Sequence, residues 1–152
     1  MRRIVGLSAL CLSVFHAASP VQAETMTQRV GQAAEAAVNA LRAGQGRSAL
    51  RPDEELAEAA ANHASDMAKN DFFSHEGSDG SDVAERVRAA GYSYCWVGEN
   101  LAEGTGDVER TLDLWMASRG HRQNLLSPEA AEFALVRAED DLWVMVLARP
   151  GC

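Results

Sequence analysis

Residues 115–126 read WMASRGHRQNLL, and this stretch decides which fold the sequence predicts. The apolar positions before it recur every three to four residues and end at Trp115, which indicates a helix from about Asp107 to Ser118. Gly120 is expected past the end of this helix, because glycine is common just after a helix C-terminus. His121 then follows on loop backbone, where binding and catalytic side chains are often found.

The sequence on either side of this stretch predicts three further helices and a late β-hairpin. The expected helices cover about Thr27–Ala43, Pro52–Asn70 and Asp82 to Gly91, the last beginning with a capping box formed by Asp82 and Glu85. The expected strands are Cys95–Glu99, Phe133–Arg137 and Leu142–Leu147, with Glu139–Asp141 as the hairpin turn. Because helices come first and strands cluster late, the predicted fold class is α+β rather than a parallel sheet.

The first residues have the features of an export signal. Two arginines precede the apolar run Ile4–Phe15, and Val21-Gln22-Ala23 fits the small-residue rule for cleavage. We therefore expect a signal peptide at residues 1–23 and a single mature domain at residues 24–152, either secreted or periplasmic. The apolar run is too short to span a membrane comfortably, and a buried N-terminal helix is the alternative interpretation.

The net charge of the chain argues against one class of partner, nucleic acid. The chain carries a net charge of −8, and loss of the leader would leave 12 basic against 22 acidic residues, or −10. Such a surface repels phosphate backbones, so no nucleic-acid partner is expected.

Cys95 and Cys152 remain in the mature chain and are expected to form one disulfide in an oxidising compartment, with two free thiols as the alternative. We expect a monomer without a transmembrane segment.

A few polar residues stand out as candidates for a site. His75 and His121 each lie beside glycine-containing loop sequence, and Glu99 lies in an otherwise apolar stretch. A partly buried carboxylate needs partners, and two imidazoles would serve. Such a set can bind a divalent metal such as Zn²⁺ with an open position, or perform acid–base chemistry on a water. His63, on an apolar helix face, is instead expected to be a core histidine with one hydrogen bond.

Motifs that would define an enzyme are absent from the sequence. His75-Glu76 is not followed by the second histidine of a zincin, and there is no nucleophile elbow, P-loop or dinucleotide-binding glycine motif. Ser74 and Ser118 flank the candidate site, but each is more typical of a turn or cap. No catalytic residue is therefore assigned from sequence.

Taken in order, five segments resemble the bacterial branch of the CAP superfamily, which comprises cysteine-rich secretory proteins, antigen 5 and pathogenesis-related 1 proteins (SCP-like domains). They are Val38–Arg42, Leu50–Met67, Phe73–Gly80, Gly91–Ala102 and Trp115–Leu126. Together they cover nearly all of the mature chain.

The resemblance implies a three-layer α–β–α sandwich, with helices flanking a small, mostly antiparallel sheet. It also implies an open cavity in which two histidines and two acids meet. His75, Glu99 and His121 match three of these positions, and Ser118 stands where many members have the second acid. We therefore expect these four residues and Asn100 in the cavity. The candidate metal ligands are His75, His121 and Glu99, in a site weakened by the missing acid.

The resemblance leaves the function open. Our leading hypothesis is a non-catalytic binding module for a divalent cation, a small lipophilic ligand, or both at separate places, with a small molecule or an extracellular or envelope protein as partner. One alternative is a metal-assisted, protease-like hydrolase of envelope or extracellular substrates, with Glu99 as general base. The other is an interaction protein with a vestigial cavity.

Overall fold

The structure is a computed structural model that describes residues 20–152, with side chains from Gly31 onward except that of Asp140. Residues 1–19, most of the expected signal peptide, lie outside the described part, and the leader stays a prediction. The helices are α1 (Pro20–Gly44), α2 (Glu54–Asn70), α3 (Val83–Ala89), α4 (Val108–Ala117) and α5 (Arg119–Leu125). The strands are β1 (Arg51–Pro52), β2 (Tyr94–Glu103), β3 (Glu132–Arg137) and β4 (Leu142–Pro150), and a 3₁₀ turn covers Glu139–Asp141.

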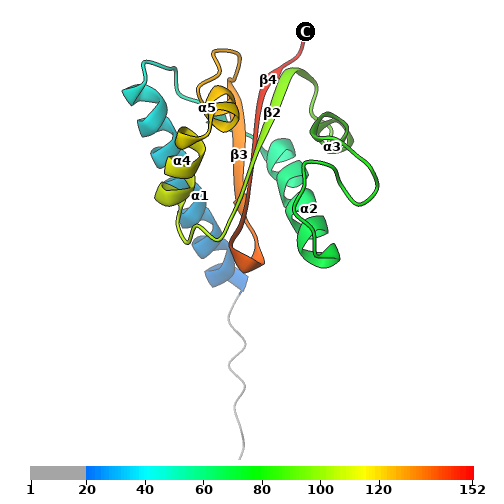
Figure 1. Cartoon of the computed structure of the whole chain (residues 1–152). Coiled ribbons are helices and arrows are strands. Elements are labelled where there is room, and N and C mark those ends of the chain that lie inside the picture. The colour runs from blue at the N-terminus through cyan, green and yellow to red at the C-terminus, as the bar shows by residue number, and fades with distance from the viewer. Residues whose placement is uncertain (1–19) are drawn as a thin grey trace, which may run out of the picture.

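The described chain forms three layers. The sheet has the order β1-β3-β4-β2, in which β4 pairs antiparallel with both β3 and β2, and β1 pairs parallel with β3. Figure 1 shows α2 and α3 on one side of the sheet and α1, α4 and α5 on the other. The predicted α–β–α sandwich with a mostly antiparallel sheet is therefore confirmed.

Strand β4 carries the core between both helical layers. It is buried continuously from Leu142 to Ala148, and successive side chains point to opposite faces of the sheet. Val144 and Val146 pack in the core with α2, whereas Trp143 and Met145 pack in the core with α1 and α4. Each inter-layer space thus has its own apolar cluster, and both clusters depend on this one strand.

The helix boundaries confirm some predicted caps and correct one. The capping box of Asp82 and Glu85 forms at the start of α3, and Gly91 follows this helix with φ of 96°, a conformation that glycine adopts without strain. Pro52 was expected in the first turn of α2 but lies in β1, paired with Phe133. The reason is that Asp53 caps α2, accepting a hydrogen bond from the Leu56 amide.

Other predicted elements differ in length or type. Helix α1 begins earlier than expected, β2 extends to Glu103 instead of Glu99, and Gly120 lies inside helix α5 instead of beyond the last helix. Ser118 has an extended backbone (φ −89°, ψ 127°) and therefore ends α4. The next residue, Arg119, begins the separate helix α5. The candidate residue His121 therefore lies on a helix and not on a loop.

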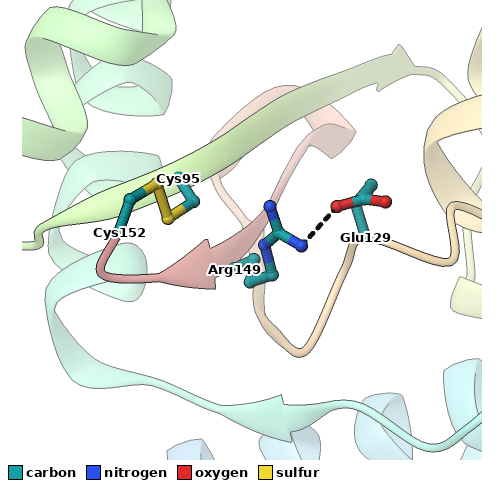
Figure 2. The surroundings of a disulfide bond; sticks show 4 residues. All are labelled: Cys95, Glu129, Arg149 and Cys152. Carbon is teal, nitrogen blue, oxygen red and sulfur yellow. Dashed lines mark ion pairs between the residues drawn. A yellow bond between two sulfur atoms is a disulfide. The ribbon is translucent and has the colours of Figure 1, made fainter.

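The predicted disulfide between Cys95 and Cys152 is present. It joins the start of β2 to the end of the chain, with Cα atoms 5.2 Å apart across 57 residues of sequence. Figure 2 shows it close to an ion pair between Arg149 and Glu129, whose Nη1 and Oε2 atoms are 2.6 Å apart. The edge strand β2 is thus covalently fastened, at the irregularity in its pairing between Tyr94 and Trp96, to the residues that follow β4.

Arg42 is the one fully buried arginine among the described side chains, at 1% exposure. Its guanidinium donates hydrogen bonds to the carbonyl oxygens of Ser48 (2.9 Å), Leu125 (2.6 Å) and Ser127 (3.3 Å). Burial, together with the charge of Arg47, lowers the pKa of Arg42. Since the Leu125 carbonyl lies at the C-terminal end of α5, Arg42 links α1 to the helix that carries His121.

We expect Arg42→Leu to destabilise the protein by about 3 kcal/mol, because it leaves buried carbonyl groups without donors. Chemical denaturation at neutral pH measures the difference. The exposed Arg47 provides the control, and Arg47→Leu is expected to change stability by less than about 0.5 kcal/mol. Equal unfolding midpoints for the two variants would contradict this role for Arg42.

Candidate functional site

His75 is held by the segment that follows α2. The helix ends at Asp71, whose left-handed backbone (φ 54°) turns the chain away from the helix axis. The carbonyl oxygen of Ser74 then returns to the helix and lies 2.9 Å from Nε2 of His63. Because this oxygen can only accept, His63 carries its proton on Nε2. His63 therefore fixes the residue directly before His75.

His63 itself matches the expected core histidine. Its ring is 1% exposed, it makes one hydrogen bond, and its Nδ1 has no partner among the described residues. Burial lowers the pKa of His63, and the nearby charge of Glu99 only partly offsets that effect. The ring is thus held neutral in the interior at neutral pH.

Glu99 is the central acid of the site. It lies on β2, which forms one edge of the sheet, and its side chain is 2% exposed. One carboxylate oxygen is 2.7 Å from Nδ1 of His75, and the other is 2.9 Å from Nη2 of Arg86. The sequence predicted a buried carboxylate between two histidines. The structure instead gives it one histidine and one arginine.

Arg86, on α3, connects the parts of this site. In addition to Glu99, its guanidinium donates to the carbonyl oxygens of Ser81 (2.6 Å) and His75 (3.0 Å). One side chain therefore neutralises the buried carboxylate and holds both ends of the loop from His75 to Ser81. Arg86 is itself largely buried, with a side-chain exposure of 10%.

Asp66, on α2, holds the middle of the same loop. Its two carboxylate oxygens accept from the backbone amide (2.8 Å) and the hydroxyl (2.6 Å) of Ser78. These hydrogen bonds lower the pKa of Asp66. The loop that carries His75 is therefore anchored by charged side chains from two helices.

The opposite face of β2 holds the helix with the second histidine. Asn100 points to the opposite side of the strand from Glu99, and its Nδ2 donates to the backbone carbonyl of His121 at 3.0 Å. Asn124, on α5, donates to both the Glu99 carbonyl and the Asn100 side-chain oxygen, each at 3.0 Å. A Cβ atom at Gly98 would lie 3.1 Å from the Asn124 oxygen, so the glycine permits this close approach.

His121 lies on α5, on the other side of β2 from His75, and the two rings interact electrostatically. Burial lowers the pKa of His121, and the charge of His75 lowers it further. The Nδ1 of His121 is buried and has no hydrogen-bond partner among the described residues. Because β2 is an edge strand, a histidine from each helical layer can reach the same border of the sheet.

The remaining predicted site residue, Ser118, is uncharged, and its role is to separate the two helices before His121. It lies between α4 and α5, and its hydroxyl forms no capping hydrogen bond. Among the described side chains, from Gly31 onward and without Asp140, no group of three or more His, Cys, Asp or Glu residues is arranged to hold a metal ion. The expected ligand set of His75, His121 and Glu99 consequently stays a prediction, and both oxygens of Glu99 already have partners.

Two site residues, Arg86 and Asn124, are not identified by the sequence analysis. Arg86 has the pattern of an ordinary charged position in a short helix, although a buried acid such as Glu99 implies a cation nearby. Asn124 lies in a region that the sequence predicts to be a loop, where its side chain has no evident role. A signal for Asn124 is nevertheless present in Gly98, whose missing side chain leaves room for a close neighbour.

Comparison with known families agrees with this geometry. The model of the cysteine-rich secretory protein (CAP) family matches residues 35–147. This chain belongs to the CAP family. The match includes every residue of the site described above.

One relative by sequence and two solved structures of similar fold, all bacterial, illustrate the match. The Bacillus subtilis protein YkwD is 36% identical over 90 residues, covering 59% of this chain and 35% of that protein. An extracellular SCP-domain protein of Bacillus anthracis has a TM-score of 0.76 at 24% identity, covering 89% of this chain and 45% of that one. An outer surface protein of Borrelia burgdorferi also has a TM-score of 0.76, at 19% identity over 82% of this chain and 96% of that one. The chain therefore spans about a third of its curated relative YkwD, and the solved structures share its fold.

The buried His63 and the half-buried His121 predict a loss of stability in mild acid. The pKa values of His63 and His121 are lowered in the folded state relative to about 6.5 in an unfolded chain. Above that value both rings are neutral in both states and stability is complete. As pH falls below about 6.5, the unfolded chain binds protons first, so the free energy of unfolding falls.

Urea denaturation at pH 7.5 and pH 5.0 measures this effect. We expect His63→Gln, which cannot titrate, to lose less stability over this interval than the native chain, with His121 supplying part of the remaining loss. An identical loss in both proteins would show that His63 is not held neutral by the fold.

Proposed function

We propose that this CAP domain is a secreted or periplasmic, non-catalytic binding module whose site lies at the β2 edge between His75 and His121. The observation that carries the proposal is the buried Glu99 carboxylate, which holds His75 through Nδ1. The His75 side chain is 60% exposed, so its Nε2 remains available for a ligand. A carboxylate that orients a histidine in this way is the usual support behind a metal-binding imidazole.

A divalent cation such as Zn²⁺ fits this arrangement through two imidazole rings. His75 would contribute Nε2 and His121 would contribute a ring nitrogen, while Glu99 would orient His75 instead of binding the ion directly. Many family members have a second acid at the position of Ser118, and this chain lacks it. Water would therefore complete the coordination of the ion. With two protein ligands instead of three or four, such a site is expected to be weak and exchangeable.

The hydrolase alternative receives less support from the same geometry. A general base needs a carboxylate oxygen that can take a proton from water. Both oxygens of Glu99 are occupied, one by His75 and one by Arg86. Glu99 is therefore better suited to positioning than to proton transfer, which favours binding over turnover.

A small lipophilic ligand has a different candidate place. A hollow of about 470 Å³ lies between α1, α2 and β3, and buried Ala34, Phe133 and Ala134 contribute to its lining. Polar residues, among them Glu35 and Asp53, lie beside it. An apolar lining with a few polar groups suits a small amphipathic molecule.

Export is proposed on three grounds. The expected leader at residues 1–23 directs the chain out of the cytoplasm, and the disulfide suits an oxidising compartment. The similar proteins of Bacillus anthracis and Borrelia burgdorferi are described as extracellular and outer surface proteins. Among the described helices, none has the length and apolar character needed to cross a membrane.

Calorimetric titration of residues 24–152 with Zn²⁺ tests the metal proposal. We expect saturable binding with one ion per chain that is lost in the His75→Ala/His121→Ala double variant. The exposed neighbour Glu76 provides a control, and Glu76→Ala is expected to bind as the native chain does.

Two further results would decide between the alternatives. Binding that is unchanged in the double variant would place the ion elsewhere and overturn the proposed site. Metal-dependent turnover on a panel of peptide, ester and glycan substrates would favour the hydrolase, and its loss in Glu99→Gln would assign the base.

A further inference from the structure

A second hollow lies at the end of the sheet where β2 finishes and β4 begins. It has a volume of about 280 Å³ and is formed by the end of α2, the segment 72–73, the end of β2 and the turn before β4. Its lining residues are Met67, Ala68, Asp71, Phe72, Phe73, Glu103, Glu139 and Leu142. None of these residues belongs to the site around Glu99.

The hollow combines an apolar floor with an exposed aromatic ring. Met67 and Leu142 are buried members of the core, and Phe72 packs against the same cluster. Phe73 is 45% exposed and is one of two large apolar side chains exposed in the described part of the chain. An occupant would therefore contact the exposed Phe73 ring and the apolar floor beneath the rim.

Three carboxylates surround this apolar surface. Asp71, Glu103 and Glu139 are exposed, and none of them forms an ion pair or side-chain hydrogen bond with another described residue. The nearby cation Arg137 does not neutralise them, because it pairs with Asp141 at 2.7 Å. The C-terminal end of α2 adds its partial negative charge at the same place.

The apolar floor and the surrounding carboxylates together favour some cationic ligands over others. A bare metal ion is disfavoured, because the described residues contain no group of three acids or other ligands arranged to hold one. A cation on an apolar stem satisfies both parts of the hollow, with methylenes on the floor and charge at the rim. Guanidinium also stacks on aromatic faces and pairs with carboxylates through two parallel hydrogen bonds, which ammonium cannot do.

We propose that this hollow binds an arginine side chain presented by a basic segment of a partner protein. The net charge of −8 on this chain would attract such a segment, and the hollow would select one side chain from it. The segment 72–73 that lines the hollow leads directly into His75, although the proposal does not depend on a ligand at His75.

Fluorescence anisotropy with a labelled Arg-Gly repeat peptide tests the proposal on residues 24–152. We expect saturable binding that weakens about tenfold in Glu103→Gln/Glu139→Gln, because a charge-assisted pair contributes about 1.4 kcal/mol or more. The control Glu54→Gln/Glu109→Gln removes the same charge from exposed acids elsewhere and is expected to weaken binding less than about twofold. Phe73→Ala, which leaves the charge unchanged, is also expected to weaken binding.

Four results would overturn the proposal. Equal weakening in both double variants would show general attraction to an acidic protein. Equal binding of a matched citrulline peptide, or no binding of the arginine peptide, would remove the role of the guanidinium. Binding of free spermidine or Ca²⁺ at Glu103 and Glu139 without binding of the peptide would assign the hollow to a small cation.

Discussion

The ionic contact between Glu99 and Arg86 is the constraint on which the site depends. A carboxylate that is 2% exposed is costly to bury alone, and Arg86 supplies the opposite charge at 2.9 Å. With that charge balanced, the second oxygen of Glu99 can hold the His75 ring at 2.7 Å. The same guanidinium fastens the loop on which His75 lies. Charge balance and histidine placement thus come from one side chain.

The edge position of β2 explains how two helical layers serve one site. Glu99 faces α2 and α3, and Asn100 faces α5, because neighbouring residues of a strand point to opposite faces. The backbone carbonyls of Glu99 and Leu101 have no strand partner on the outer side, and they accept hydrogen bonds from Asn124 and Trp115. The strand edge is therefore covered by side chains of α4 and α5, and His121 is brought to the border of the sheet as part of this cover.

The resemblance to the CAP family implied the layers of this fold and grouped His75, Glu99 and His121 as candidate site residues, but it did not imply the contacts between them. The α2 and α3 helices were predictable because their caps are local, as in the Asp82 and Glu85 box. Strand β1 was not predicted, because its two residues carry no strand pattern of their own and form a strand only by pairing with β3. Helix α5 was not predicted, because glycine such as Gly120 often ends a helix and the tertiary hydrogen bonds of Asn124 and Arg42 that hold this helix cannot be seen in the sequence. His75 and Glu99 were brought together by family resemblance, whereas Arg86 could be recognised only from distances.

The most direct test of this account is the protonation of the His75 ring. Nitrogen-15 NMR of labelled imidazole at pH 8.5 distinguishes a proton on Nδ1 from one on Nε2. The account predicts that His75 carries its proton on Nδ1, directed at Glu99, with Nε2 free to bind a ligand. A proton on Nε2, with Nδ1 unprotonated beside the carboxylate, would contradict the account, because Glu99 would then not orient the ring.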